Sequence, residues 1–366
     1  MKIRDLLNII EDTAPLSLQE SWDNSGLIVG DPNADVEKVL VCLDVTEAVV
    51  DEAISKNCNL IISHHPIIFK GIKSLVPHGY VERTVIKAIR HEIGIASMHT
   101  NLDNSPVGVN KRIADKLGLI RASILDPKVG LLKKIVTYAP QKEAERVRLA
   151  MFEAGAGNIG NYDSCSFNVV GEGTFRANAL AQPFVGQQDK LHTEAEVRIE
   201  VIVPHYQLNR VIESLLKTHP YEEVAYDVIP LDNSWTNAGS GMVGFFEQPM
   251  KEKDFLELVS ATFEVPMVRH SPFLNRNIQK VAVCGGSGAF LLSSAKRAKA
   301  EAFITADIKY HDFFDADNAL LMVDAGHFET EQFTKELIAD ILRKKIPNFA
   351  VLFSEVNTNA VGYYFK

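Results

Sequence analysis

Residues 60–66, Leu-Ile-Ile-Ser-His-His-Pro, form an apolar run that ends in two adjacent histidines and a proline. The run predicts a buried strand, and open α/β folds bind ligands in the loops that follow such strands. Neighbouring side chains of an extended chain point in opposite directions. We therefore expect His64 and His65 to hold one metal ion each of a close pair. A surface loop that happens to contain two histidines is the alternative interpretation.

Strand and helix patterns alternate through residues 1–127 and return over residues 235–366. Apolar segments such as 38–45, 94–98 and 319–324 predict buried strands, and amphipathic segments between the strands predict helices. Such alternation predicts mainly parallel sheets covered by helices. The two blocks therefore predict an α/β core that is built in two parts.

The middle block, residues 128–234, has a different order of elements. Its patterns predict strand, helix, strand, strand, helix and strand, over residues 133–138, 141–154, 164–175, 195–203, 205–218 and 222–231. This βαββαβ order predicts a ferredoxin-like domain. Pro127 and the Asp-Asn-Ser stretch at 232–234 supply turn-forming residues at its two ends. We expect a small domain inserted between the two halves of the larger one.

Charge and composition exclude several classes of protein. The net charge of −9 and the pI of about 5.7 argue against nucleic-acid or anionic-membrane partners. No run reaches the roughly 18 apolar residues that a membrane helix needs. The first residues predict an amphipathic helix rather than a signal peptide. The four cysteines show no CxxC spacing and predict reduced thiols. We therefore expect a cytoplasmic protein.

Further candidate metal ligands follow other predicted strands. Asp103 closes the segment His-Thr-Asn-Leu-Asp, and its hard carboxylate suits a divalent ion, although a helix cap or turn explains it equally well. His327 and Glu331 stand four positions apart at the start of a predicted helix, so both face the same way. Metalloenzymes use this spacing to place two ligands on one turn. A solvated helix face is the alternative.

The combined set of predicted ligands is His64, His65, Asp103, His327 and Glu331. Three imidazoles and two carboxylates suit a pair of borderline ions such as Zn²⁺, Fe²⁺ or Mn²⁺. We expect Glu331 to bridge the ions, with His64 and His327 on one ion and His65 and Asp103 on the other. A water between two such ions has a lowered pKa and acts as a nucleophile near neutral pH.

Three other residues are candidates for a catalytic role. His99 is expected to orient Asp103 or to move protons. Asp307 and His311, near the end of another predicted strand, are candidates for substrate binding or proton transfer, and a structural loop explains them at least as well. Residues 285–288, Gly-Gly-Ser-Gly, lack the lysine of a Walker loop and the third glycine of the dinucleotide motif. They indicate a tight turn between a strand and a helix.

Six segments, in a fixed order along the chain, resemble the NIF-three-like family, whose members are often labelled GTP cyclohydrolase 1 type 2 homologues. The segments are SWDNSGLIVG, LIISHHPIIF, MHTNLDN, VAVCGGSGAFLL, TADIKYHD and DAGHFETE. The resemblance implies two divalent ions per subunit at the five predicted ligands, with Glu331 touching both. It also implies a ring-shaped homohexamer around an interior cavity and identifies the middle block as a PII/CutA-like insert.

Two classes of function stay open. The first is a metal-dependent hydrolase that acts on a nucleotide-like substrate, with zinc as the first choice of metal and iron or manganese as the others. The family label implies opening of the imidazole ring of GTP, yet the sequence shows no purine-specific pocket and no triphosphate clamp. The second is a non-enzymatic regulatory or metal-delivery protein with a small-molecule-sensing insert. An open coordination position distinguishes the first class from the second.

Overall fold

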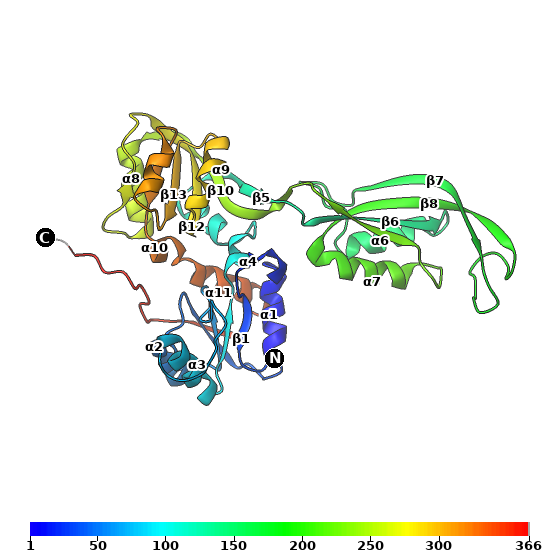
Figure 1. Cartoon of the computed structure of the whole chain (residues 1–366), viewed down its shortest axis with the longest axis horizontal. Coiled ribbons are helices and arrows are strands. Elements are labelled where there is room, and N and C mark those ends of the chain that lie inside the picture. Colours follow the sequence, from blue (N-terminus) through cyan, green and yellow to red (C-terminus); the bar gives the residue numbers. More distant parts are fainter. Residues whose placement is uncertain (365–366) are drawn as a thin grey trace. The chain divides into compact units, whose positions relative to one another are not determined.

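The computed structural model describes residues 1–364, which form a mixed α/β fold with three sheets. The chain divides into two compact units. The larger unit combines Met1–Asp126 with the chain from Ala238 onward, and the smaller unit is Pro127–Asn237. Figure 1 shows the elements of both units along the chain.

The first sheet of the larger unit has five strands in the order β1-β4-β3-β2-β15. The bounds of these strands are Gly26–Val29 (β1), Lys38–Cys42 (β2), Leu60–Ser63 (β3), Gly94–Ser97 (β4) and Ala350–Phe353 (β15). Strands β2, β3, β4 and β15 run parallel, whereas β1 pairs with β4 in the antiparallel direction.

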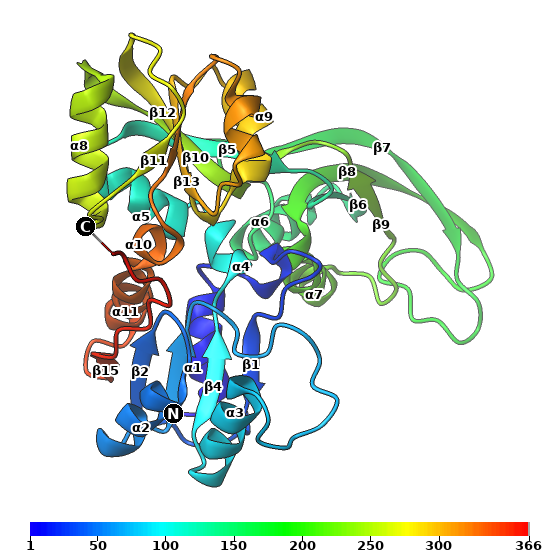
Figure 2. The same cartoon turned by 60° about the vertical axis from the view of Figure 1, so that its left-hand side comes forward.

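Helices cover both faces of this sheet (Figures 1 and 2). Their bounds are Ile3–Glu11 (α1) and Thr334–Lys345 (α11) on one face, and Glu47–Ser55 (α2) and Tyr80–Arg90 (α3) on the other. Val39 and Val41 of β2 pack with α1 and α11, whereas Leu40 and Cys42 pack with α2 and α3. Because both faces of the strand are buried, its sequence is a continuous apolar run rather than an alternating one.

The second sheet of the larger unit has six strands in the order β11-β14-β13-β12-β10-β5. Their bounds are Ile120–Lys128 (β5), Trp235–Lys251 (β10), Arg269–His270 (β11), Asn277–Ser287 (β12), Ala302–Ala306 (β13) and Leu321–Asp324 (β14). One face of this sheet packs against Val109–Lys116 (α5) and Glu252–Phe263 (α8). The other face packs against Leu292–Arg297 (α9).

The expectation of mainly parallel sheets is wrong, because the sheets are mixed. Strands β12, β13 and β14 run parallel, but β10 pairs with β12 and β11 pairs with β14 in the antiparallel direction. A large sheet commonly carries antiparallel strands beside a parallel centre, and antiparallel pairing requires no crossover helix. Apolar periodicity reports that a strand is buried and leaves its direction open.

The smaller unit contains a four-stranded, antiparallel sheet in the order β7-β8-β6-β9. Its elements along the chain are Leu132–Pro140 (β6), Ala144–Glu153 (α6), Ser166–Arg176 (β7), Leu191–Pro204 (β8), Leu208–Thr218 (α7) and Tyr226–Leu231 (β9). Ile135, Ile199 and Val201 of the sheet pack with Val147 of α6 and Val211 of α7. Strands β7 and β8 extend beyond the end of β6 as a two-stranded ribbon. In this ribbon the pairing runs from Glu172 opposite Ala195 to Arg176 opposite Leu191.

The remaining helices are short, and two of them follow strand ends of the larger unit. These are Thr100–Asp103 (α4), which follows β4, and His327–Glu331 (α10), which follows β14. The 3-10 turns are Leu16–Leu18 (η1), His205–Gln207 (η2), Ala289–Leu291 (η3) and His311–Ala316 (η4). No helix among residues 1–364 combines the length and apolar character that crossing a bilayer demands.

Candidate metal centre

The carboxyl ends of parallel strands from both sheets of the larger unit meet at one cluster of imidazoles and carboxylates. His64 and His65 follow β3, Asp103 ends α4 after β4, and α10 after β14 carries His327 and Glu331. The ligand atoms of His65, His327 and Glu331 lie within 4.8 Å of one another. These groups can hold a metal ion, because imidazole nitrogens and a carboxylate are suitable donors for a divalent cation.

His64 is fully buried and has one ring nitrogen without a partner. Its Nδ1 lies 2.8 Å from the carbonyl oxygen of Met98, so Nδ1 carries the proton and donates it. Its Nε2 has no hydrogen-bond partner in the described part of the chain and lies 3.7 Å from Asp103 Oδ1 and 3.6 Å from Glu331 Oε1. A buried lone pair without a donor is costly unless a cation occupies the space before it.

His65 and His327 approach the other oxygen of Glu331. The Nε2 atoms of His65 and His327 lie 3.0 Å and 3.1 Å from Glu331 Oε2. The opposite ring nitrogens are held by carboxylates, since His65 Nδ1 is 2.8 Å from Asp44 Oδ1 and His327 Nδ1 is 2.6 Å from Asp307 Oδ2. A carboxylate on the far nitrogen fixes the ring orientation and raises its basicity, as is usual for histidines that bind metals.

The two oxygens of Glu331 thus face two different groups of side chains. Oε1 faces His64, which in turn faces Asp103, and Oε2 faces His65 and His327. This grouping differs from the expected one, in which His64 shares an ion with His327 and His65 with Asp103. The expectation that the side chains of His64 and His65 point in opposite directions is wrong, because their ring centroids lie 4.8 Å apart and both rings approach Glu331. Each of the two histidines also meets a partner from the other expected group.

The charges of the cluster depend on one another. Burial opposes protonation of His65, but its hydrogen bonds to Asp44 and Glu331 outweigh burial and raise its pKa to about 9. Burial likewise opposes protonation of His327, and hydrogen bonds to Asp307 and Glu331 raise its pKa to about 11. For the Glu331 carboxyl, burial favours the neutral form, but the surrounding imidazoles hold its pKa well below the usual value. The buried carboxylate therefore requires positive charge beside it, from protons or from metal ions.

Gly286 of β12 makes the position of Glu331 possible. A Cβ atom at this residue would lie 2.2 Å from Glu331 Oε1 and 3.2 Å from His327 Nε2, distances that leave no room for a side chain. Its φ of +60° is also in the left-handed region that favours glycine. The expectation of a turn over Gly-Gly-Ser-Gly is wrong, because residues 285–287 are the last residues of β12 and only Gly288 lies between this strand and η3. The sequence analysis also did not anticipate that Gly286 opens space for the cluster.

His99 lies closer to the cluster than the sequence analysis expected. Its Nδ1 is 2.7 Å from Asp23 Oδ1, so a carboxylate holds this ring as well. Burial opposes ionisation of Asp23, but the hydrogen bonds to His99 and Thr100 lower its pKa. Ligand atoms of His64, His65 and His99 lie within 4.8 Å of one another. His99 therefore has the position of a further donor, besides that of a group that orients others.

The other two catalytic candidates have different positions. Asp307 follows β13 and contacts His327, whose hydrogen bond lowers the pKa of the Asp307 carboxyl. This contact makes Asp307 a positioning residue for the imidazole. His311 begins η4, is exposed, and packs its ring against Tyr310 with the centroids 5.2 Å apart. His311 is not among the residues that line the cavity beside the cluster.

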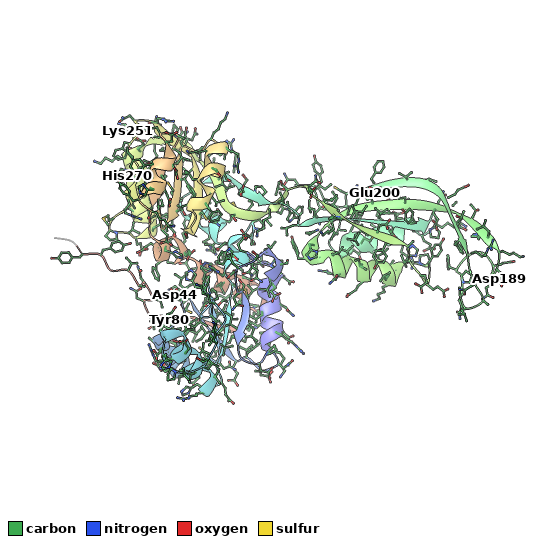
Figure 3. All side chains as sticks on the ribbon, viewed as in Figure 1. Asp44, Tyr80, Asp189, Glu200, Lys251 and His270 are labelled. Atoms are coloured by element: carbon green, nitrogen blue, oxygen red, sulfur yellow. The ribbon has the colours of Figure 1, made fainter. Side chains whose placement is uncertain are left out.

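A cavity of about 720 Å³ adjoins the cluster. His65, His99 and His327 form part of its wall, and Asp44 and Tyr80, labelled in Figure 3, also line it. Four carboxylates reach this wall, those of Asp44, Asp307, Asp324 and Glu329. The wall also contains the guanidinium group of Arg269, which forms an ion pair with Asp324.

The last described residues cross the same cavity. Thr358 Oγ1 donates to Asp44 Oδ2 at 2.8 Å, and Asn359 Nδ2 donates to Glu329 Oε1 at 2.9 Å. Tyr363 also donates its hydroxyl proton to Glu329 Oε1, at 3.2 Å. Glu329 therefore holds this segment in place, whereas Glu331 on the same helix faces the imidazoles. A molecule that reaches the cluster through this cavity contacts the segment 358–363.

Comparisons with known proteins extend over almost the whole chain. The family model described as Duf34/NIF3 (NGG1p interacting factor 3) matches residues 1–360. A Halalkalibacterium halodurans protein named "GTP cyclohydrolase 1 type 2 homolog" is 39% identical over 359 residues, which are 97% of this chain and 96% of the relative. A Staphylococcus epidermidis protein of the same name is 34% identical over 368 residues, 99% of this chain and 100% of the relative.

Solved structures agree with the fold. A Bacillus cereus protein related to NIF3 superposes with a TM-score of 0.86 at 36% identity, covering 100% of this chain and 99% of that one. A Staphylococcus aureus protein superposes with a TM-score of 0.78 at 33% identity, with the same coverage. Both likenesses include the smaller unit, so the inserted segment is part of the shared architecture.

Proposed function

Because the chain belongs to the Duf34/NIF3 family, we propose that its imidazole and carboxylate cluster binds two divalent metal ions. The observation that carries this proposal is the buried Nε2 of His64, which lacks any hydrogen-bond partner within residues 1–364 while Nδ1 is held by Met98. The proposed ligands are the five that the sequence indicates: His64, His65, Asp103, His327 and Glu331. Glu331 would bridge the two ions, since its two oxygens face different groups of donors.

The donor set favours zinc, with iron or manganese as the other candidates. Imidazole suits all three metals, and two carboxylates add the charge that a pair of dications requires. Such ions, when bound, act as Lewis acids and lower the pKa of water. The chain itself contributes orientation: Asp44 and Asp307 hold the rings of His65 and His327 through their Nδ1 atoms.

We propose that the protein is a metal-dependent hydrolase for a nucleotide-like substrate. The cavity of about 720 Å³ has the volume that a nucleotide-sized ligand requires, and it opens onto His65, His99 and His327. His99, oriented by Asp23, is the group best placed to move a proton beside the cluster. The names of the relatives point to GTP, so GTP is the first substrate to test.

The test of this function uses metal-free protein reloaded with Zn²⁺, Fe²⁺ or Mn²⁺. Elemental analysis gives the metal content, and chromatography with mass spectrometry detects hydrolysis or ring opening of GTP. We expect turnover only after reloading, and none in a His99→Ala variant that keeps its metal. The matched control is His311→Ala, which changes an exposed histidine outside the cavity wall. Absence of turnover with every metal would overturn the hydrolase proposal and leave metal binding in place.

A non-enzymatic role in regulation or metal delivery is the second candidate, and the charge of the cavity favours it. Four carboxylates line the wall and its one guanidinium group is already paired, so a polyphosphate finds no unpaired arginine or lysine among the described residues there. An acidic passage attracts cations instead. Transfer of the bound metal to a chelator or an acceptor protein, without any turnover, would support this role.

We further propose that the smaller unit is a ferredoxin-like insert of the PII/CutA type, and that six copies of the chain form a ring. The strand order β7-β8-β6-β9, antiparallel throughout, and two helices packed on one face support the first proposal. Family membership supports the second. Light scattering coupled to gel filtration tests it, since a mass below six chains would contradict the ring.

The four unbridged cysteines support a reducing, cytoplasmic setting.

A further inference from the structure

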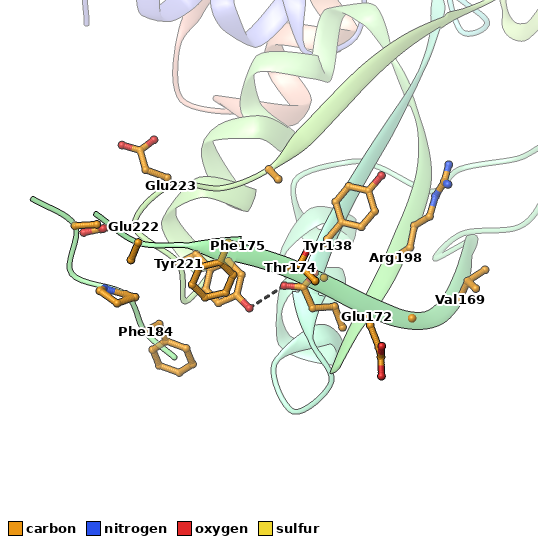
Figure 4. Close-up of a pocket in the computed structure, with 17 residues that line it drawn as sticks. Tyr138, Val169, Glu172, Thr174, Phe175, Phe184, Arg198, Tyr221, Glu222 and Glu223 are labelled. Carbon is orange, nitrogen blue, oxygen red and sulfur yellow. Dashed lines mark hydrogen bonds between the residues drawn. The ribbon is translucent and has the colours of Figure 1, made fainter. Parts of the chain in front are cut away.

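The smaller unit has a cavity of its own, with a volume of about 600 Å³. Figure 4 shows the residues that line it. The cavity lies on the face of the β7–β8 ribbon that the helices leave open, because Glu196 and Arg198 of β8 line it while Val197 and Ile199 pack into the helix-covered core. Ala181 and Phe184, from the loop between β7 and β8, form one wall. No residue of the candidate metal centre belongs to this lining.

Two glycines of β7, Gly171 and Gly173, line the cavity and place no side chain in it. A Cβ atom at Gly171 would meet nothing within 4 Å, so this position opens onto free space. A Cβ atom at Gly173 would lie 2.1 Å from Glu196 Oε2, so the missing side chain gives the Glu196 carboxylate its place. Glycine in a strand interior weakens the strand and often marks a close approach of another group. The two glycines therefore leave the space above this ribbon open to a ligand.

Three aromatic rings form a wall of the cavity, although they come from separate segments. Phe175 lies at the end of β7, Phe184 in the loop after it, and Tyr221 between α7 and β9. The ring centroids of Phe175 and Tyr221 are 6.1 Å apart, and those of Phe184 and Tyr221 are 6.4 Å apart, both in tilted arrangements (Figure 4). Phe184 is 56% exposed, so the face of its ring is accessible to a ligand in the cavity.

The charges of the lining are predominantly negative. Glu172, Glu196, Glu222 and Glu223 line the cavity, against the single cation Arg198. Arg198 already pairs with Glu200, at 2.9 Å. Tyr221 donates to Oε1 of Glu196 at 2.8 Å, and the described residues provide no donor for Oε2. Glu196 is only 9% exposed as a residue, and its Oε2 is available as an acceptor on the side of the cavity that it lines.

We propose that this cavity binds an organic cation with an aromatic or other apolar body. Aromatic faces attract cations through the ring quadrupole, and a carboxylate nearby adds direct Coulomb attraction and accepts hydrogen bonds from an ammonium group. The apolar part of the ligand covers the exposed ring of Phe184, and its ammonium group donates to Oε2 of Glu196. An anionic ligand of the same shape meets four carboxylates and is rejected.

The test compares three probes of nearly equal shape on the full-length protein. The probes are 3-phenylpropylammonium, the neutral 3-phenylpropan-1-ol and the anionic 3-phenylpropanoate, each measured by isothermal titration calorimetry. We expect the ammonium compound to bind at least about tenfold more tightly than the alcohol, which corresponds to about 1.4 kcal/mol, and the carboxylate to show no binding. Equal affinities for the ammonium compound and the alcohol would overturn the assignment of charge. Absence of binding by all three would overturn the site.

Two variants test whether the probes bind in this cavity. Gly171→Leu places an apolar side chain above the ribbon at a position where a Cβ atom meets nothing within 4 Å. We expect it to abolish binding of all probes while the melting temperature stays near the wild-type value. Glu196→Gln keeps an acceptor for Tyr221 and removes the charge. This variant should weaken binding of the ammonium compound about tenfold and leave the affinity for the alcohol unchanged.

The matched control is Glu213→Gln, which removes an equal charge from an exposed position of α7. It should leave all affinities as they are. Unchanged binding in a folded Gly171→Leu variant would contradict the location. A loss in the control equal to that in Glu196→Gln would show that only the overall charge of the insert matters, which would also contradict the proposal.

Discussion

The Nε2 atoms of His65 and His327 lie 3.3 Å apart, although 262 positions separate the two residues along the chain. Each ring has its opposite nitrogen held by a carboxylate, Asp44 for His65 and Asp307 for His327. Both free nitrogens therefore point at one volume, which also contains Oε2 of Glu331. Two nitrogens and a carboxylate oxygen in this arrangement are satisfied together by one cation, and this relationship leads to the first prediction.

Replacement of His327 by alanine should lower the metal content of the purified protein. The variant removes one of three donors from the group around Glu331 Oε2, so the ion held there loses affinity. Elemental analysis after gel filtration measures the effect, and His311→Ala is the control because His311 is exposed and does not line the cavity. Equal metal content in wild type and a folded His327→Ala protein would refute the proposed ligand set.

The carboxylates behind the rings should also affect metal affinity, although they touch no ion. Asp44→Asn and Asp307→Asn keep the shape of the side chain but weaken the acceptor for Nδ1 of His65 and His327. We expect each to reduce metal affinity about 10–100-fold, the usual effect of losing such a partner. Competition with a chromogenic chelator measures the affinity. Asp51→Asn, which changes an exposed ion pair with Lys87, should have no effect and serves as the control.

Much of the site could be predicted because parallel strands align their carboxyl ends. The loops after β3, β4 and β14 carry His64, Asp103 and His327, and each follows an apolar run that the sequence shows plainly. The i, i+4 spacing placed Glu331 on the same face of α10 as His327. The structure brings these side chains into one cluster, and their role as metal ligands stays a prediction.

The grouping of these residues could not be predicted from the sequence. It depends on how two separate sheets pack, and local periodicity contains no information about that packing. The partners Asp23 and Asp44 were missed for a similar reason, since each precedes its histidine by more than 20 positions. Asp23 lies in the segment SWDNSGLIVG, but nothing in that segment indicates a contact with His99. Gly286, a residue of β12, was wrongly interpreted as a turn residue, and its close approach to Glu331 was missed because that side chain lies 45 positions further on.

Gly286→Ala tests the close approach separately from the backbone conformation. Gly118 is the matched control, because its φ of +76° is also left-handed but a Cβ atom there would meet nothing within 4 Å. Alanine at Gly118 should cost about 1–2 kcal/mol of stability and leave the metal content unchanged. Alanine at Gly286 should cost more and should also lower metal content, because it displaces Glu331 Oε1. Chemical denaturation and elemental analysis measure the two effects, and equal results for both variants would exclude the proposed role of Gly286.

The hydrogen bonds of His219 in the smaller unit suit the neutral imidazole and predict a loss of stability in acid. Its Nδ1 accepts from the backbone N–H of Tyr221 at 3.1 Å, so Nε2 carries the proton and donates it to the carbonyl of Tyr138 at 2.9 Å. His219 is 7% exposed, and burial lowers its pKa below the usual value of 6.5. The unfolded chain therefore binds the proton more readily, and the stability contributed by this residue is present above pH 6.5 and is lost as the pH falls below it.

The loss should not exceed about 1.4 kcal/mol per pH unit, the limit for one titrating group. His219→Gln keeps a donor for Tyr138 but does not titrate, so its stability should vary less between pH 7 and pH 5 than that of the wild type. The control is His205→Gln, which replaces an exposed histidine of the same unit and should retain the wild-type pH dependence. Denaturant titrations at several pH values measure the difference, and parallel pH profiles for wild type and His219→Gln would show that His219 is not the group responsible.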